Sequence, residues 1–350
     1  MVLHTTYRDR AAAMIENDRL RVTVLTGGGH IAEVYDKDAG VNPLWTPTWP
    51  SIEPSSFDPV RHREYGKGPE ARLLAGIMGH NVCLDLFGGP SDEEMAAGLT
   101  VHGEAPLVPY ETTGEGHELV LRATLPLAQL RFERRIVLHD RGVRIREIVE
   151  NVASHDRPVG WTQHVTLGPP FLERGATEFR VSATQSQVYD GTFGDDDYLR
   201  PGTLFDWPHA PRIEGGHEDL RRFTSAPRSS AYTAHLMDPQ DPHAFFVAFS
   251  QRFRLAFGYV WKRADFPWTG IWEENRSRKH PPWNGEAITC GMEFGVSPFP
   301  ETRRQMIERG RFFGTPTFRW IPAGTRVEAE YWALAARTSM IPESLGWPDR

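Results

Sequence analysis

Apolar and polar residues alternate along much of the chain, a pattern typical of β-strands with one buried face. The clearest example runs from 119 to 149, where apolar and charged residues alternate on both sides of a turn at His139-Asp140-Arg141-Gly142. Period-two alternation on either side of such a turn predicts a β-hairpin. Similar short segments, each predicted to be a strand, recur at 20–25, 31–35, 244–249, 255–261 and 327–336.

Many short strands separated by turns predict an all-β protein, because long amphipathic helical patterns are scarce and 32 glycines and 28 prolines punctuate the segments. We expect one domain over 1–350, a large antiparallel β-sandwich with few short helices. Two segments, about 45–69 and 190–228, are expected to be long loop insertions, which are usually functional or mobile. A short helical turn is expected at 301–309.

Composition narrows the class of protein. The 350 residues carry a net charge of -7 without a long basic run, which argues against a nucleic-acid partner. No apolar stretch reaches the ~18 residues of a membrane span, and no signal peptide is recognisable, so we expect a cytoplasmic protein. A homodimer is compatible with the sequence. Cys83 and Cys290 are expected to be buried thiols, and they form no CxxC zinc motif.

Two histidines are candidates for chemistry. His102 is followed by Gly103, and a glycine after a histidine allows a sharp backbone turn that can direct the imidazole into a cleft. His164 lies between Thr162 and Thr166, so in a strand all three share one polar face. Taken separately, a His-Gly pair is structural more often than functional, and His164 could equally be structural.

Glu293 lies between Gly291 and Gly295, so a strand here would leave space on both sides of its carboxylate. Glycine within a strand often marks the close approach of a ligand or of another backbone. The opposite face of the same strand is apolar and carries Met292, Phe294 and Val296. The pattern favours a functional glutamate over a solvated one on an edge strand.

Aromatic and acidic residues are interleaved just upstream. Trp268 and Trp272 lie four positions apart, which in a strand places them on one face with Gly270 between them. A sugar ring has an apolar C–H face and a belt of hydroxyl groups, so it suits an aromatic platform surrounded by carboxylates and amides. Tryptophan is also a common core residue, so this pattern alone does not settle the ligand.

Together these segments resemble the aldose 1-epimerase (galactose mutarotase) family and its wider superfamily. The segment 15–34 is similar to the opening hairpin of the family, and the order His102, His164, Glu293 is similar to its two catalytic histidines and catalytic glutamate. The resemblance implies a large antiparallel β-sandwich. It also implies a cofactor-independent isomerase with a small sugar as its substrate.

The resemblance also implies where the sugar is contacted: at His80 and Asn81, with Trp272 and Trp268 as the aromatic wall. The family commonly has an Asn-Arg pair before its first histidine, whereas here Asn81 is followed by Val82. The chain therefore departs from the family at an arginine that contacts sugar.

Anomer exchange needs one proton removed from the anomeric hydroxyl and another delivered to the ring oxygen. The resemblance implies Glu293 as the general base, His164 as the general acid and His102 as a second donor near the ring oxygen. A positioned acid or base contributes typically ~10²–10⁴-fold to a rate.

Three other interpretations remain open from the sequence. The first is a carbohydrate-binding or sensing protein without activity, because a fold does not fix a function. The second is a glycoside hydrolase or lyase that uses Glu273 or Glu274 together with Glu293. The third is a metal site, although no short ligand spacing supports it, built from four candidate ligands: His80, His102, His164 and Glu293.

Overall fold

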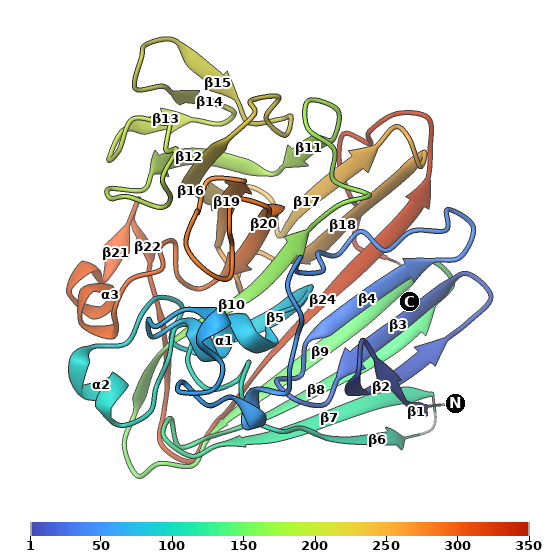
Figure 1. The fold of residues 1–350 in the computed structure, drawn as a ribbon, viewed down its shortest axis with the longest axis vertical. Helices are drawn as coiled ribbons and strands as arrows, with labels where there is room; N and C mark the ends of the chain where they lie inside the picture. Colours follow the sequence, from blue (N-terminus) through green and yellow to red (C-terminus); the bar gives the residue numbers. More distant parts are fainter. Residues whose placement is uncertain (1, 116, 349–350) are drawn as a thin grey trace.

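The computed structural model describes residues 2–115 and 117–348, and within them nearly all regular structure is antiparallel β-sheet. A twelve-stranded and an eight-stranded sheet account for most of the described strands, and two small two-stranded sheets complete them (Figure 1). This confirms the all-β sandwich expected from the alternating pattern.

The larger sheet carries the site described below. Its strands, in order across the sheet, are β1 (Leu3–Tyr7), β2 (Arg10–Glu16), β3 (Leu20–Leu25), β4 (Ile31–Asp36), β5 (His80–Asp85), β10 (Arg157–Leu167), β20 (Ile288–Gly295), β19 (Trp268–Asn275), β16 (Ser229–Met237), β12 (Ala183–Val188) and β13 (Leu204–Asp206). Strand β23 (Arg319–Ile321) pairs with the first residues of β10. The centre of this sheet thus joins strands from the first, middle and last thirds of the chain.

The smaller sheet forms the second layer. Its strands, in order, are β11 (Glu178–Val181), β17 (His243–Ser250), β18 (Leu255–Lys262), β24 (Arg326–Arg337), β9 (Gly142–Asn151), β8 (Leu130–His139), β7 (Glu118–Leu125) and β6 (Glu111–Glu115). The hairpin predicted around Asp140 is confirmed as β8–β9, in which Leu130 pairs with Asn151 and His139 with Gly142. The strands predicted at 20–25, 31–35, 244–249, 255–261 and 327–336 are confirmed as β3, β4, β17, β18 and β24.

Helices among the described residues are short: α1 (Ala71–Gly76), α2 (Asp92–Ala96), α3 (Arg303–Arg309) and the 3-10 turns Pro54–Ser56 and Arg63–Tyr65. The helical turn expected at 301–309 is confirmed as α3, whose N-terminus is capped by Thr302. The segment expected as a loop at 190–228 also contains the short strands β13, β14 (His209–Pro211) and β15 (His217–Asp219). Near the C-terminal end, β21 (Arg311–Phe312) pairs with β22 (Thr315–Pro316). None of the described helices has the length and apolar character needed to cross a membrane.

The main core lies between the two sheets, because one cluster of buried apolar side chains draws on both. Met292 and Phe294 of β20 point into it, as their alternation predicted, and the Phe294 ring stacks 4.2 Å from the Trp261 ring of β18. The same alternation turns Glu293 toward the opposite face of the sheet. Cys83 and Cys290 are both buried free thiols, as expected.

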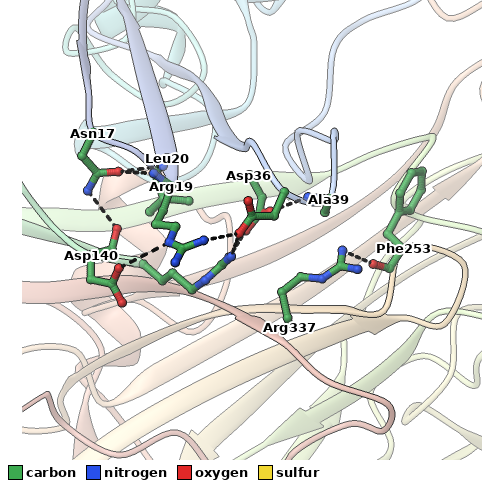
Figure 2. A network of polar contacts seen from close by, with 10 residues as sticks. Asn17, Arg19, Leu20, Asp36, Ala39, Asp140, Phe253 and Arg337 are labelled. Carbon is green, nitrogen blue, oxygen red and sulfur yellow. Dashed lines mark hydrogen bonds and ion pairs between the residues drawn. The ribbon is translucent and has the colours of Figure 1, made fainter.

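A group of ion pairs fastens the two layers at one end (Figure 2). Arg141, in the β8–β9 turn, pairs with Asp36 at the end of β4 and with Asp38. Arg19 approaches Asp38 at 3.0 Å and Asp140 at 3.9 Å. Asp36 is buried, but Arg19, Asp38 and Asp140 are largely exposed, so the pairs among these three add little stability by themselves. Their arrangement aligns the ends of the two sheets.

Candidate active site

A row of facing residues crosses the centre of the larger sheet. Asn81 of β5 lies opposite His164 of β10, His164 lies opposite Glu293 of β20, and Glu293 lies opposite Gly270 of β19. Residues opposite one another on antiparallel strands share a face, with Cβ atoms about 4.5–5.5 Å apart. The pairing therefore gathers an amide, an imidazole and a carboxyl group on the face directed away from the main core.

Glycines beside this row provide the space that Glu293 needs. A Cβ atom at Gly291 would lie 2.4 Å from Glu293 Oε1 and 3.1 Å from Trp272 Cε3. At Gly270, a Cβ atom would lie 2.0 Å from the hydroxyl oxygen of Tyr232. The two glycines let a carboxyl group and two aromatic side chains pack side by side, which is the close approach suggested by the glycine-flanked glutamate.

Both ring nitrogens of His164 are engaged. Its Nε2 lies 3.0 Å from Glu293 Oε1, and its Nδ1 lies 2.9 Å from the hydroxyl oxygen of Thr166, two residues along the same strand. The side chains of His164 and Glu293 are only 5% and 3% exposed. His164 is thus held in one orientation and in turn holds the Glu293 carboxyl.

His102 reaches the same place from the loop between α2 and β6. Its Nδ1 donates to the carbonyl oxygen of Phe87 at 2.6 Å, because a carbonyl can only accept. His102 has a φ of 69°, and Gly103 after it has a φ of 74° with no room for a Cβ beside Leu84, so the glycine serves the sharp turn that was expected. The His102 and His164 rings are 4.9 Å apart, and His102 Nε2 has no partner among the described residues.

His102, His164 and Glu293 line one cavity of about 140 Å³. A cavity of ~150 Å³ holds a benzene ring, so the volume suits one six-membered ring rather than an oligosaccharide. Most of the wall is apolar: leucine and isoleucine side chains come from α1 and the residue after it, and Val101 and five aromatic or proline side chains complete it. The full apolar set is Leu73, Leu74, Ile77, Phe87, Val101, Phe193, Trp272, Trp283 and Pro300. Glu70 and Arg278 complete the lining.

Burial controls the protonation of the three groups. It raises the pKa of Glu293 to about 8, against a smaller lowering by the Arg278 charge. It lowers the pKa of His102 to about 4, against a smaller effect of the bond to Phe87, and it lowers the pKa of His164 well below its usual value. Near neutral pH the site therefore contains a protonated carboxyl group and neutral imidazoles. Perturbed values of this kind in a cavity are typical of functional sites.

The predicted sugar-contacting residues have different positions. Trp272 is in the cavity wall, 5.7 Å from the His164 ring. Asn81 is next to His164 in the row but does not line the cavity, and its amide atoms are buried without a partner among the described residues.

His80 and Trp268 lie outside the cavity. His80 neighbours Asn81 on β5, so its ring points into the main core, where it bonds to Tyr259 and Gln163 at 3.1 and 3.0 Å. Trp268 shares a face with Trp272 but is covered by Phe312, and its Nε1 donates to the carbonyl of Pro316 at 2.8 Å. Neither position supports the predicted contact with sugar.

Glu273 and Glu274, the expected partners of Glu293 in a glycoside hydrolase, do not line this cavity. Glu273 points to the opposite face from Glu293 and approaches the Tyr198 hydroxyl at 3.3 Å. Glu274 is four positions beyond Gly270, the partner of Glu293, which is ~13 Å along the strand. Its Oε1 accepts the backbone N–H groups of Ser277 and Arg278. The described residues also include no group of three or more side chains that could hold a metal ion.

Two contributors to the cavity carry no signal in the sequence. Arg278 and Phe193 belong to segments without periodicity, and the structure joins them through hydrogen bonds from the Arg278 guanidinium to the Phe193 carbonyl. Phe193 lies in the segment expected to be a long loop insertion at 190–228. The acidic residues of that segment could have drawn attention to it, but nothing indicated which side chain would reach the site.

Comparison with known proteins bears on the fold. No protein-family model matches the sequence, and neither does any curated protein sequence. Solved structures do match. A candidate aldose 1-epimerase from Klebsiella pneumoniae has a TM-score of 0.64 at 13% identity, over 97% of this chain and 83% of its own.

Two other structures match over nearly their whole length. A galactose mutarotase-like protein from Clostridium acetobutylicum has a TM-score of 0.62 at 12% identity, over 97% of this chain and 99% of its own. A protein from Synechocystis sp. PCC 6803 has a TM-score of 0.62 at 15% identity, over 96% of this chain and 99% of its own. This chain therefore has the fold of the galactose mutarotase-like proteins, as the resemblance implied.

Proposed function

We propose that this protein interconverts the anomers of a monosaccharide by acid–base ring opening. The observation that supports the proposal is the meeting of Glu293 and His102, each with an unoccupied atom, in a cavity the size of one sugar ring. The second carboxyl oxygen of Glu293 and Nε2 of His102 have no partner among the described residues. The fold shared with galactose mutarotase-like proteins agrees with this function.

The reaction requires only two proton transfers. In the form favoured near neutral pH, His102 Nε2 accepts the proton of the anomeric hydroxyl while the Glu293 carboxyl donates its proton to the ring oxygen. The bond between the anomeric carbon and the ring oxygen breaks, and its electron pair stays on that oxygen. The open aldehyde then rotates about C1–C2, and the reverse transfers close the ring on the other face and restore both groups.

This assignment differs from the roles implied by the resemblance, in which His164 is the acid and Glu293 the base. Because both nitrogens of His164 are engaged by Glu293 and Thr166, His164 acts here as a positioning residue. If the proton of Glu293 sits on His102 instead, Glu293 becomes the base and His102 the acid. The site holds the same number of protons in both forms. Between about pH 4 and about pH 8, Glu293 and His102 together carry the single proton that the reaction needs.

The direct test follows the approach of pure sugar anomers to equilibrium, by polarimetry or NMR, for several free and phosphorylated aldoses. We expect Glu293→Gln and His102→Asn each to lower the rate by at least ~10²-fold, the lower end for loss of a positioned acid or base. Glu286→Gln is the matched control, because Glu286 is an exposed residue close in sequence.

Full activity in Glu293→Gln would exclude the proposed acid. Activity lost on chelation would favour a metal site instead. Tight binding of a sugar without anomer exchange by the purified protein would favour a binding or sensing protein on the same scaffold.

A further inference from the structure

Arg278 is held at the cavity wall inside a cage of aromatic rings. Its guanidinium carbon is 4.9 Å from the centre of the Trp283 ring, 5.4 Å from that of Trp272 and 5.6 Å from that of Phe193. The side chain is only 16% exposed. A cation at these distances from ring faces is attracted by the rings, and more strongly when it is shielded from water.

The guanidinium is fixed by one of its edges. Nε and Nη2 both donate to the carbonyl oxygen of Phe193, at 3.2 and 2.9 Å, and the Glu274 carboxylate approaches Nε at 3.6 Å. Nη1 has no partner among the described residues. On the other edge, the N–H groups of Nη1 and the second N–H of Nη2 are therefore free to donate in parallel. Arg278 lines the same cavity as Glu293 and His102.

We propose that this open edge of Arg278 binds the carboxylate of the substrate, so that the preferred ligand is a hexuronic acid rather than a neutral hexose. The inference rests on the proposed function for the reaction, but it concerns binding and can be tested separately. In this arrangement the carboxylate lies at Arg278, and the anomeric carbon lies between Glu293 and His102.

Three features of the cavity favour a carboxylate. The parallel N–H groups of a guanidinium match the two oxygens of a planar carboxylate, and such bidentate pairs are among the strongest hydrogen bonds in proteins. Arginine has only donors, so a hydroxyl group at this edge would leave its own proton without an acceptor there. The cavity of about 140 Å³ leaves little room for a phosphate beyond the sugar ring.

The other charged groups around the cavity do not fill this position. Glu274 is partly satisfied by two backbone N–H groups and meets Arg278 at Nε, away from the open edge. Glu70 lies 3.7 Å from His280 and is itself half exposed. An anionic group of the ligand would therefore be the closest partner for the remaining donors of Arg278.

The test compares binding and exchange for matched ligands: galacturonate with galactose, and glucuronate with glucose and glucose 6-phosphate. Binding is followed by tryptophan fluorescence, because Trp272 and Trp283 line the cavity, and exchange is followed by NMR. We expect the wild-type protein to bind a hexuronate at least about tenfold more tightly than the corresponding neutral hexose.

The variants locate the effect. Arg278→Gln should weaken hexuronate binding about 10- to 100-fold, the range for a charged hydrogen-bonded pair, and change neutral hexose binding by less than about threefold. Arg278→Lys should keep part of the preference for hexuronates, because lysine retains the positive charge but lacks the two parallel N–H donors. Arg276→Gln, at an exposed arginine two residues earlier, is the control and should match the wild type.

The results also separate this inference from the proposed function. Hexuronate binding that depends on Arg278 without anomer exchange would support the inference and overturn the proposed function. Exchange of neutral hexoses with no preference for hexuronates, or equal losses for both classes in Arg278→Gln, would overturn the inference and keep the function. A preference for glucose 6-phosphate over glucuronate would also overturn it.

Discussion

The buried Glu293 should make this protein less stable as the pH rises, and replacing it with glutamine should remove that loss. Burial raises the pKa of Glu293 from 4.5 to about 8. In the unfolded chain the carboxyl group loses its proton near pH 4.5, whereas in the folded protein it keeps the proton up to about pH 8. Between these values the unfolded state binds fewer protons, so the free energy of unfolding falls with pH.

The size of the effect follows from that interval. One pH unit corresponds to ~1.4 kcal/mol, so the interval from 4.5 to about 8 corresponds to roughly 5 kcal/mol. The stability that Glu293 contributes below pH 4.5 is lost progressively as the pH rises to about 8. Above that pH the loss does not increase further. Glu293→Gln does not titrate, so relative to the wild type its free energy of unfolding should rise by ~1.4 kcal/mol per pH unit across this window.

Equilibrium urea unfolding of both proteins at several pH values from 4.5 to 9 provides the measurement. The difference between variant and wild type is the informative quantity, because the other titrating groups are common to both proteins and cancel. A difference that stays flat between pH 5 and pH 8 would refute the reasoning, since it would mean that Glu293 ionises equally in the folded and unfolded states. The expected gain in stability accompanies a loss of activity, as is common at functional sites.

Two further predictions concern the same centre. The kcat/KM for anomer exchange should be highest between about pH 4 and about pH 8 and fall on either side, because the pKa of His102 is lowered to about 4 and that of Glu293 is raised to about 8; a profile that rises steadily beyond pH 9 would contradict this. Gly291→Ala should push the Glu293 carboxyl away from His164 and lower the rate at least ~10-fold with the fold retained. Gly346→Ala, where a Cβ atom meets nothing within 4 Å, should have no effect; rate assays and circular dichroism test both variants.

The fold could be predicted because its signal is local. Alternation in the segment around Asp140 fixes the β8–β9 hairpin, and the apolar face of Met292 and Phe294 fixes which way Glu293 points. The glycines beside Glu293 leave gaps that are visible in the sequence. In the structure the Glu293 carboxyl fills the one at Gly291, whereas Thr162 fills the one at Gly295.

The rest of the site depends on relations that the sequence does not contain. His80 and Asn81 are neighbours, and the pattern around them did not show which would face the core, so His80 was expected at the sugar although it bonds to Tyr259. Trp268 has the right face but lies under Phe312. Arg278 reaches the cavity from a segment whose path is set by tertiary contacts, and no periodicity marks such a residue.

The row that joins Asn81, His164, Glu293 and Gly270 also has a consequence for the order of folding. The β19–β20 hairpin brings Gly270 opposite Glu293, but His164 and Asn81 come from distant parts of the chain, so no local hairpin contains the whole row. Pairings of such long range form slowly, because the intervening chain must be closed into loops first. During refolding, ellipticity and tryptophan fluorescence should therefore recover before activity does, and the appearance of activity marks the moment at which β5, β10, β20 and β19 lie in register.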